Sequence, residues 1–206
     1  MVLSHAHIDH SGALPLLVKR GFRGPIYCTS GTADLLELLL RDAAHLQEEE
    51  ADFRNRHAQT KHAPALPLYT VADAETALRQ VEPREFEQAF APADGATVLF
   101  RRAGHIMGSA TVELTFAAGG TLVFTGDLGR YGRPILRDPE PVPRADVLLI
   151  ESTYGDRVHT GDAAADLERA VKDAAQRGGA LVIPAFAVGR TQELLWMLRE
   201  DRKSVV

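Results

Sequence analysis

The stretch SHAHIDH at residues 4–10 places three histidines and one aspartate within six positions. In an extended chain, side chains two residues apart project to the same side, so His5 and His7 can contact one ion together. Asp9 and His10 are adjacent, so a turn must direct both toward a second position nearby. Imidazole and carboxylate groups suit Zn²⁺ and, less selectively, Fe²⁺ or Mn²⁺. The segment predicts a metal site, and a histidine-rich surface loop is the weaker alternative.

Two later residues are candidates to complete this site. His105 lies in the segment AGHIMGS at residues 103–109, where glycines on both sides allow close backbone approach. Asp127 lies in FTGDLG at residues 124–129, just past a predicted strand, where a carboxylate can bridge two ions. Taken singly, a lone histidine between strands is more often structural, and such an aspartate more often caps a turn. Together with the first motif they favour a metal site.

The composition is typical of a folded globular protein. The chain has 206 residues, 45% of them hydrophobic and 25% charged, which excludes dominant disorder and collagen-like or coiled-coil architectures. The single Cys28 lies in an apolar stretch and predicts a buried, reduced thiol in a cytoplasmic protein. No apolar run reaches the roughly 20 residues of a membrane span, and no signal-peptide pattern opens the chain, so we expect no membrane partner.

The net charge of −5 argues against a protein that coats nucleic acid by bulk electrostatics. It leaves room for an enzyme in which metal ions supply the positive charge for a polyanion. The charge balance therefore excludes one mode of nucleic-acid binding and not nucleic acid as a substrate.

Hydrophobic periodicity predicts an α/β layered fold. A helix is expected from Ser30 to about Glu50, capped by Ser30 or Thr32 and followed by a loop over residues 51–68. The other predicted helices begin near 14–17, near 72–80 with Thr70 or Asp73 at the start, after a cap at Asp162, and at 189–191. Strands are predicted at 96–101, 110–116 and 121–125, with a hairpin between the last two. Two further strands are predicted at 147–150, buried on both faces, and at 180–183.

Residues 5–10, His105 and Asp127 together resemble the signature of the metallo-β-lactamase superfamily, in which a His-x-His-x-Asp-His loop precedes a single His and a single Asp. The resemblance implies an αββα sandwich. It also implies that His5, His7 and His105 hold a first metal, that Asp9 and His10 hold a second, and that Asp127 bridges the two. The family's last second-site histidine has no counterpart among the 206 residues.

Two longer segments resemble the β-CASP branch of that superfamily, which processes RNA or DNA. They are DVLLIESTYG at residues 146–155 and IPAFAVGRTQELL at residues 183–195, and residues 61–70 also resemble its bacterial members. The resemblance implies that Glu151 is the first β-CASP motif and orients a later histidine through a hydrogen bond. Arg190, near a predicted helix N-terminus, is a candidate phosphate contact, with a structural ion pair as the alternative.

Both ends of the chain favour a fragment of a longer protein. Only residues 1–3 precede the first motif and can form its strand, and residues 201–206 interrupt an apolar helical pattern. We expect a metallo-β-lactamase core without its N-terminal strands over residues 1–155, which makes the sandwich incomplete. The start of a β-CASP cassette is expected over 156–200, and a non-native tail over 201–206.

The function implied by the resemblance is two-zinc hydrolysis of phosphodiester bonds in single-stranded RNA, with a hydroxide between the metals as nucleophile. Asp9, Asp127 and Glu151 are the residues assigned to catalysis. The 206 residues by themselves are expected to have little activity. A homodimer is among the compatible oligomeric states.

Two alternatives remain. The first is a hydrolase of a thioester, lactone or β-lactam on the same metal scaffold, against which the 151–155 and 184–195 segments argue. The second is a partner subunit that keeps the fold but lacks chemistry. Such subunits usually lose metal ligands, whereas every ligand position within this span is filled.

Overall fold

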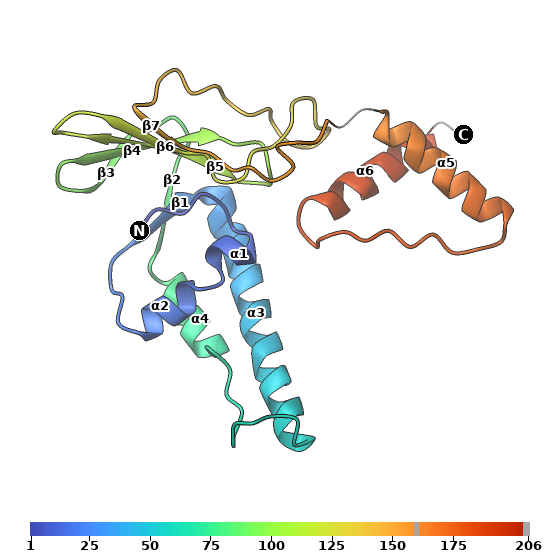
Figure 1. The fold of residues 1–206 in the computed structure, drawn as a ribbon, viewed down its shortest axis with the longest axis horizontal. Coiled ribbons are helices and arrows are strands. Elements are labelled where there is room, and N and C mark those ends of the chain that lie inside the picture. The colour runs from blue at the N-terminus through green and yellow to red at the C-terminus, as the bar shows by residue number, and fades with distance from the viewer. Residues whose placement is uncertain (159–160, 204–206) are drawn as a thin grey trace. The chain divides into compact units, whose positions relative to one another are not determined.

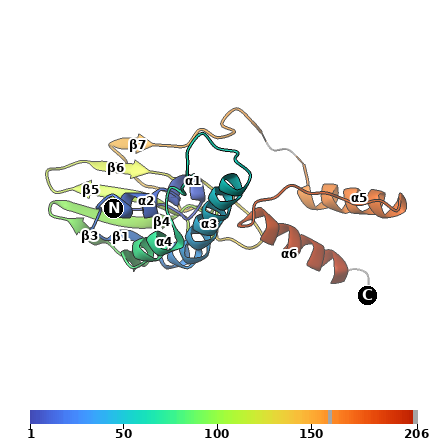
Figure 2. The same ribbon diagram turned by 90° about the horizontal axis from the view of Figure 1, so that it is seen from below.

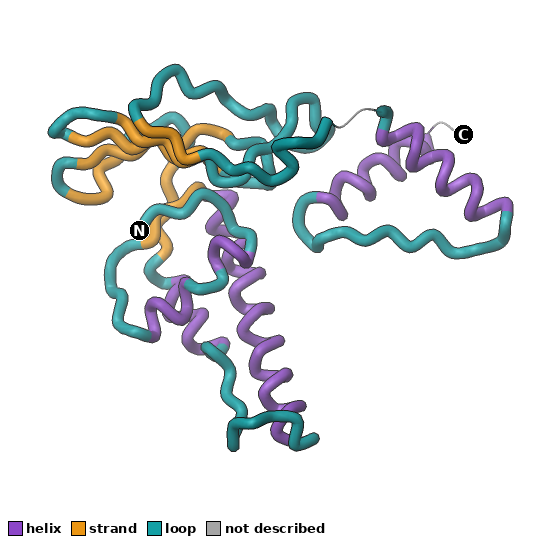
Figure 3. Tube along the Cα trace, viewed as in Figure 1, coloured by secondary structure: helices purple, strands orange, loops and turns teal. Residues whose placement is uncertain are grey.

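The computed structural model describes residues 1–158 and 161–203 (Figures 1 and 3). The chain divides into two compact units. The first comprises Met1–Tyr131 and Arg137–Glu151, and the second comprises Gly132–Leu136 and the chain from Ser152 onward. The division expected between residues 155 and 156 stays a prediction.

The first unit contains a five-stranded sheet in the order β3-β4-β5-β6-β7 (Figure 1). Neighbouring strands are antiparallel, except that β6 and β7 are parallel. The strands are β3 (Phe90–Ala93), β4 (Ala96–Arg102), β5 (Ala110–Phe116), β6 (Thr121–Phe124) and β7 (Val147–Leu149). The hairpin predicted between β5 and β6 is confirmed, since Phe116 N–H donates to the carbonyl of Gly120 at 3.1 Å.

A second, parallel pair of strands lies between this sheet and a layer of helices (Figures 1 and 2). The pair is β1 (Ile26–Thr29) and β2 (Val81–Arg84), and Val2 forms a parallel bridge to Tyr27 of β1. The helices are α1 (Ile8–Ser11), α2 (Leu14–Lys19), α3 (Ser30–Arg56) and α4 (Val71–Leu78). This mixed α/β arrangement is the predicted incomplete αββα sandwich.

Local capping explains where the two longer helices of this unit begin. The N-cap of α3 is Thr29, whose side chain accepts a hydrogen bond from Thr32 N–H at 3.2 Å, so the predicted cap at Ser30 or Thr32 is wrong. The helix also runs to Arg56, past the predicted end, with Glu–Arg pairs at four-residue spacing along it. Thr70 caps α4 as predicted, and Asp73 completes a capping box with it.

The core of the large sheet is the buried cluster of Val98, Phe100, Ala110 and Val112 on β4 and β5. We expect Phe100→Ala to lower the free energy of unfolding by about 3–5 kcal/mol, because the truncation loses apolar burial and leaves a cavity. Denaturant titration measures this change. Phe53→Ala, at a side chain 46% exposed on α3, is the matched control, and an equal loss there would contradict the assignment.

Two apolar segments differ from expectation in their burial. Residues 147–149 form β7, but each side chain is about half exposed, because β7 is the last strand of the described sheet and only β6 pairs with it. Residues 180–183, predicted to be a buried strand, form no strand, and Val182 is 86% exposed. A strand needs a neighbour to pair its backbone groups, and nothing among the described residues pairs with this segment.

The second unit contains α5 (Ala163–Gln176) and α6 (Arg190–Lys203). Asp162 caps α5 as predicted, since its side chain accepts hydrogen bonds from Ala164 N–H at 3.0 Å and Ala165 N–H at 3.2 Å. Of the predicted tail, residues 201–203 continue α6, and residues 204–206 lie outside the described residues. Across 1–158 and 161–203, no helix combines the length and the apolar content that crossing a membrane requires.

Candidate metal centre

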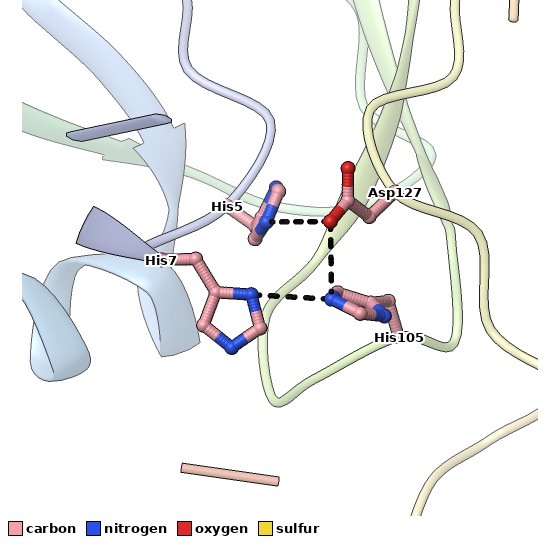
Figure 4. Close-up of side chains that lie close together, drawn as sticks. All are labelled: His5, His7, His105 and Asp127. Atoms are coloured by element: carbon pink, nitrogen blue, oxygen red, sulfur yellow. Dashed lines mark hydrogen bonds and ion pairs between the residues drawn. The ribbon is translucent and has the colours of Figure 1, made fainter. Parts of the chain in front are cut away.

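Three segments far apart in the sequence carry the predicted site residues to one place in the first unit (Figure 4). His5 and His7 follow the bridge at Val2 and precede α1, whereas His105 lies between β4 and β5 and Asp127 follows β6. Backbone hydrogen bonds hold the first segment, because Leu3 N–H donates to Tyr27 O at 2.9 Å and Ala110 N–H donates to Ser4 O at 2.8 Å. The site therefore lies where β1, β5 and β6 meet the N-terminal segment.

His5, His7, His105 and Asp127 each offer one ligand atom, and these atoms all lie within 4.8 Å of one another. His7 Nδ1 lies 3.1 Å from His105 Nε2. Asp127 Oδ2 lies 3.4 Å from His105 Nε2 and 3.7 Å from His5 Nε2. Figure 4 shows the three imidazoles and the carboxylate converging on a common space.

The polar atoms of this cluster are better suited to coordinating a divalent cation than to forming hydrogen bonds with one another. His5 Nε2 and His7 Nε2 are buried and have no hydrogen-bond partner within the described structure. Buried polar atoms without partners are rare in native proteins and call for an explanation. Three imidazoles and a carboxylate form a donor set of the kind that zinc binds. The donors present therefore fit a bound metal ion.

Two of the histidines, His5 and His105, are held in the form that binds metal. Burial lowers the pKa of His5 to about 3, with a smaller contribution from the neighbouring His10, His105 and His7. Burial also lowers the pKa of His105, although the charge of Asp127 acts in the opposite direction. Both imidazoles are therefore neutral at neutral pH, as metal coordination requires.

This burial predicts a pH dependence of stability in the metal-free protein. The pKa of His5 is about 3 when folded, against about 6.5 when unfolded, so its contribution is fully present above pH 6.5 and is lost as the pH falls toward 3. The loss is on the order of 5 kcal/mol. About 3 kcal/mol of this loss should occur between pH 7 and pH 4, and denaturant titrations of chelator-treated protein over that interval measure it.

His5→Gln removes the titrating group and should flatten this dependence. His62→Gln changes an exposed histidine in the 57–68 loop and should leave it intact. An unchanged profile in His5→Gln would contradict the assignment.

His10 and Asp9 lie beside the cluster rather than within it. His10 Nε2 is 3.3 Å from Asp127 Oδ1, the carboxylate oxygen that does not face His5 and His105. Asp9 Oδ2 is 3.4 Å from the same His10 nitrogen, but the Asp9 side chain is 77% exposed. The two oxygens of Asp127 therefore face two different sets of side chains. The roles assigned to Asp9 and His10 stay predictions.

Glu151 contacts the Asp127 segment directly. Its carboxylate accepts a hydrogen bond from Leu128 N–H, and its own N–H donates to Thr125 Oγ1 at 3.2 Å. A pocket of about 380 Å³ opens beside it, lined by His10, Phe124, Gly126, Asp127, Leu148, Leu149, Ile150 and Glu151.

Arg190 is exposed at the first residue of α6, in the second unit. Its predicted phosphate contact stays a prediction.

Two residues that hold the site were not singled out in the sequence. Ser4 Oγ lies 3.1 Å from His5 Nδ1. Gly129 N–H donates to the carbonyl of Ala103 at 2.7 Å, and Ala103 lies two residues before His105. A hydroxyl next to a candidate ligand and a glycine soon after Asp127 were the available signals. Neither pattern identifies the contact, because the Ser4 contact depends on side-chain orientation and the Gly129 contact joins two distant segments of the chain.

The sequence profile of the β-lactamase superfamily domain matches residues 1–185. The chain belongs to this superfamily. The resemblance expected from the histidine and aspartate motifs is therefore confirmed. Among solved structures, one similar protein is a metallo-β-lactamase with a HARLDQ motif from Cronobacter sakazakii, at 20% identity and a TM-score of 0.41. The alignment covers 65% of this chain and 42% of the Cronobacter chain.

The names of three curated relatives of this β-lactamase-superfamily chain refer to RNA cleavage or to transcription. Ribonuclease TTHA0252 of Thermus thermophilus is 36% identical over 96% of this chain and 42% of its own length. Transcription termination factor FttA of Methanosarcina mazei is 36% identical over 100% of this chain and 31% of its own length. Probable RNase MJ4 of Methanocaldococcus jannaschii is 34% identical over 96% of this chain and 44% of its own. The chain thus spans less than half the length of these relatives.

Proposed function

We propose that the protein to which these residues belong hydrolyses phosphodiester bonds of single-stranded RNA with bound divalent metal ions. The observation that carries the metal chemistry is the convergence of four ligand atoms, including the buried and unpaired Nε2 of His5. The RNA substrate is supported by the ribonucleases among the relatives. A cytoplasmic location accords with such a role.

In this proposal His5, His7 and His105 hold a first ion, preferably Zn²⁺, with Mn²⁺ or Fe²⁺ as alternatives. His10 and Asp9 belong to a second position. The support for Asp127 as the bridge is its geometry, since Oδ2 faces His5 and His105 while Oδ1 faces His10. Burial keeps the imidazoles of His5 and His105 neutral, so the protein does not need to lose protons from these two residues to bind metal near neutral pH.

Bound ions at these positions would lower the pKa of a water molecule and neutralise charge on the phosphoryl oxygens. The residues of the chain supply the geometry. Glu151 accepts the Leu128 N–H and so keeps the segment that follows Asp127 in place. This contact supports a positioning role for Glu151, in addition to the orientation of a later histidine that the family resemblance implies.

The decisive experiment is an assay of single-stranded RNA hydrolysis by the full-length protein. We expect activity that depends on added metal and is abolished by His7→Ala or Asp9→Ala. Equal activity of the wild type and both variants would refute the proposal. Hydrolysis of nitrocefin or a thioester, without RNA cleavage, would establish the alternative hydrolase.

Elemental analysis separates an enzyme from a partner subunit without chemistry. We expect zinc to copurify with the folded protein and chelator to lower its melting temperature. A metal at about 100 times its Kd stabilises the folded state by about 2.7 kcal/mol. Thermal melts with and without chelator measure the shift, with His7→Ala as the variant that should show none. A folded wild type without metal, and with no response to zinc, would favour the partner subunit.

A further inference from the structure

We propose that Ser4 is a positioning residue that sets the tautomer of His5, so that Nε2 of His5 carries the lone pair that binds metal. The proposal rests on the metal site proposed above and assigns a role to a residue outside its ligand set. Its basis is the contact of Ser4 Oγ with His5 Nδ1 at 3.1 Å, between two buried residues.

A neutral imidazole has one nitrogen that donates a hydrogen bond and one that accepts. On the site side, His5 Nε2 has no hydrogen-bond partner within the described structure, and Asp127 Oδ2 at 3.7 Å is beyond hydrogen-bond distance. A proton on Nε2 would therefore be buried without an acceptor. A proton on Nδ1 finds the Ser4 oxygen. The contacts favour the Nδ1–H tautomer, which leaves Nε2 free for a metal ion.

Ser4 is itself held by two other segments of the site. Its carbonyl accepts the N–H of Ala110 at 2.8 Å, at the start of β5. Gly126, next to Asp127, has a positive φ of 55° and packs so closely that an added Cβ would lie 2.8 Å from both Cβ and Oγ of Ser4. The hydroxyl is thus fixed against the His5 ring by β5 on one side and the Asp127 segment on the other.

The expected effect follows from what removal of the hydroxyl leaves behind. In Ser4→Ala, a proton on His5 Nδ1 would be buried without a partner, which disfavours the tautomer that binds metal. Loss of such an orienting partner typically weakens metal affinity by about 10–100-fold. Ser11→Ala is the matched control, because Ser11 is equally buried in the same segment but its hydroxyl donates to the carbonyl of Ala6 at 2.8 Å.

The test combines a spectroscopic and a binding measurement. In ¹⁵N-labelled, metal-free wild type, NMR of the His5 imidazole should show the proton on Nδ1. The Kd for zinc, from competition with a chelator, should rise about 10–100-fold in Ser4→Ala and stay within about twofold of wild type in Ser11→Ala. Denaturant titration of both metal-free variants separates lost affinity from lost folding.

A proton on Nε2 in the metal-free wild type would overturn the inference, as would an unchanged zinc affinity in Ser4→Ala. The tautomer is measured without metal or RNA. Failure of the full-length protein to cleave RNA would therefore refute the proposed function and leave this assignment standing.

Discussion

Asp127→Asn should abolish metal-dependent activity in the full-length protein. The substitution preserves the shape of the side chain but removes the charge from a carboxylate that lies within 3.7 Å of His5, His10 and His105. We expect zinc content to fall and RNA hydrolysis to drop by about 10³-fold, equivalent to about 4 kcal/mol of transition-state stabilisation. Elemental analysis and the single-stranded RNA assay measure the two effects.

Asp94→Asn is the control for this substitution, because it neutralises an exposed aspartate in the turn between β3 and β4. It should retain both zinc and activity. Full zinc content in Asp127→Asn, with activity close to that of the wild type, would show that this carboxylate does not hold the metal.

Gly129→Ala should destabilise the fold and the site together. An added Cβ at Gly129 would lie 1.7 Å from Gly104 O and 2.7 Å from His105 N, and backbone atoms cannot rotate away as a flexible side chain can. The 103–105 segment must therefore shift and carry His105 with it. We expect the free energy of unfolding to fall by about 3 kcal/mol or more. Zinc affinity should fall as well, since one of the three imidazoles loses its position.

Gly179→Ala provides the comparison, because the nearest atom to its added Cβ would be Ala174 O at 3.8 Å, an ordinary contact. We expect a change within about 0.5 kcal/mol there. Denaturant titration and zinc competition measure both variants. Gly129→Ala with wild-type stability and zinc affinity would show that the 103–105 and 127–129 segments do not depend on this close approach.

Much of the fold could be predicted from local patterns. The strand at 110–116 alternates apolar and polar residues, and Gly119 and Gly120 mark the hairpin that leads to β6. Asp162 and Thr70 were recognisable as caps because the capping side chain bonds backbone two or three residues away. Such signals are local, so one sequence contains them in full.

Burial was harder to predict for the apolar runs. Residues 147–150 and 180–183 have similar composition, yet the first run forms a half-exposed strand and the second forms none. An apolar run indicates only that burial is favourable. Whether a neighbouring strand or layer covers it depends on distant parts of the chain, which a local pattern does not contain.

For the candidate site, the sequence alone determined which donors are available and their order along the chain: His5, His7, His105 and Asp127, with Asp9 and His10 beside them. Only the tertiary structure decided that His7 presents Nδ1 to His105, that the oxygens of Asp127 face different partners, and that Ser4 meets the far nitrogen of His5. The physical reason is that ligand identity is a property of a residue. Ring orientation and contact depend on how β1, β5 and β6 bring together segments 98 residues apart.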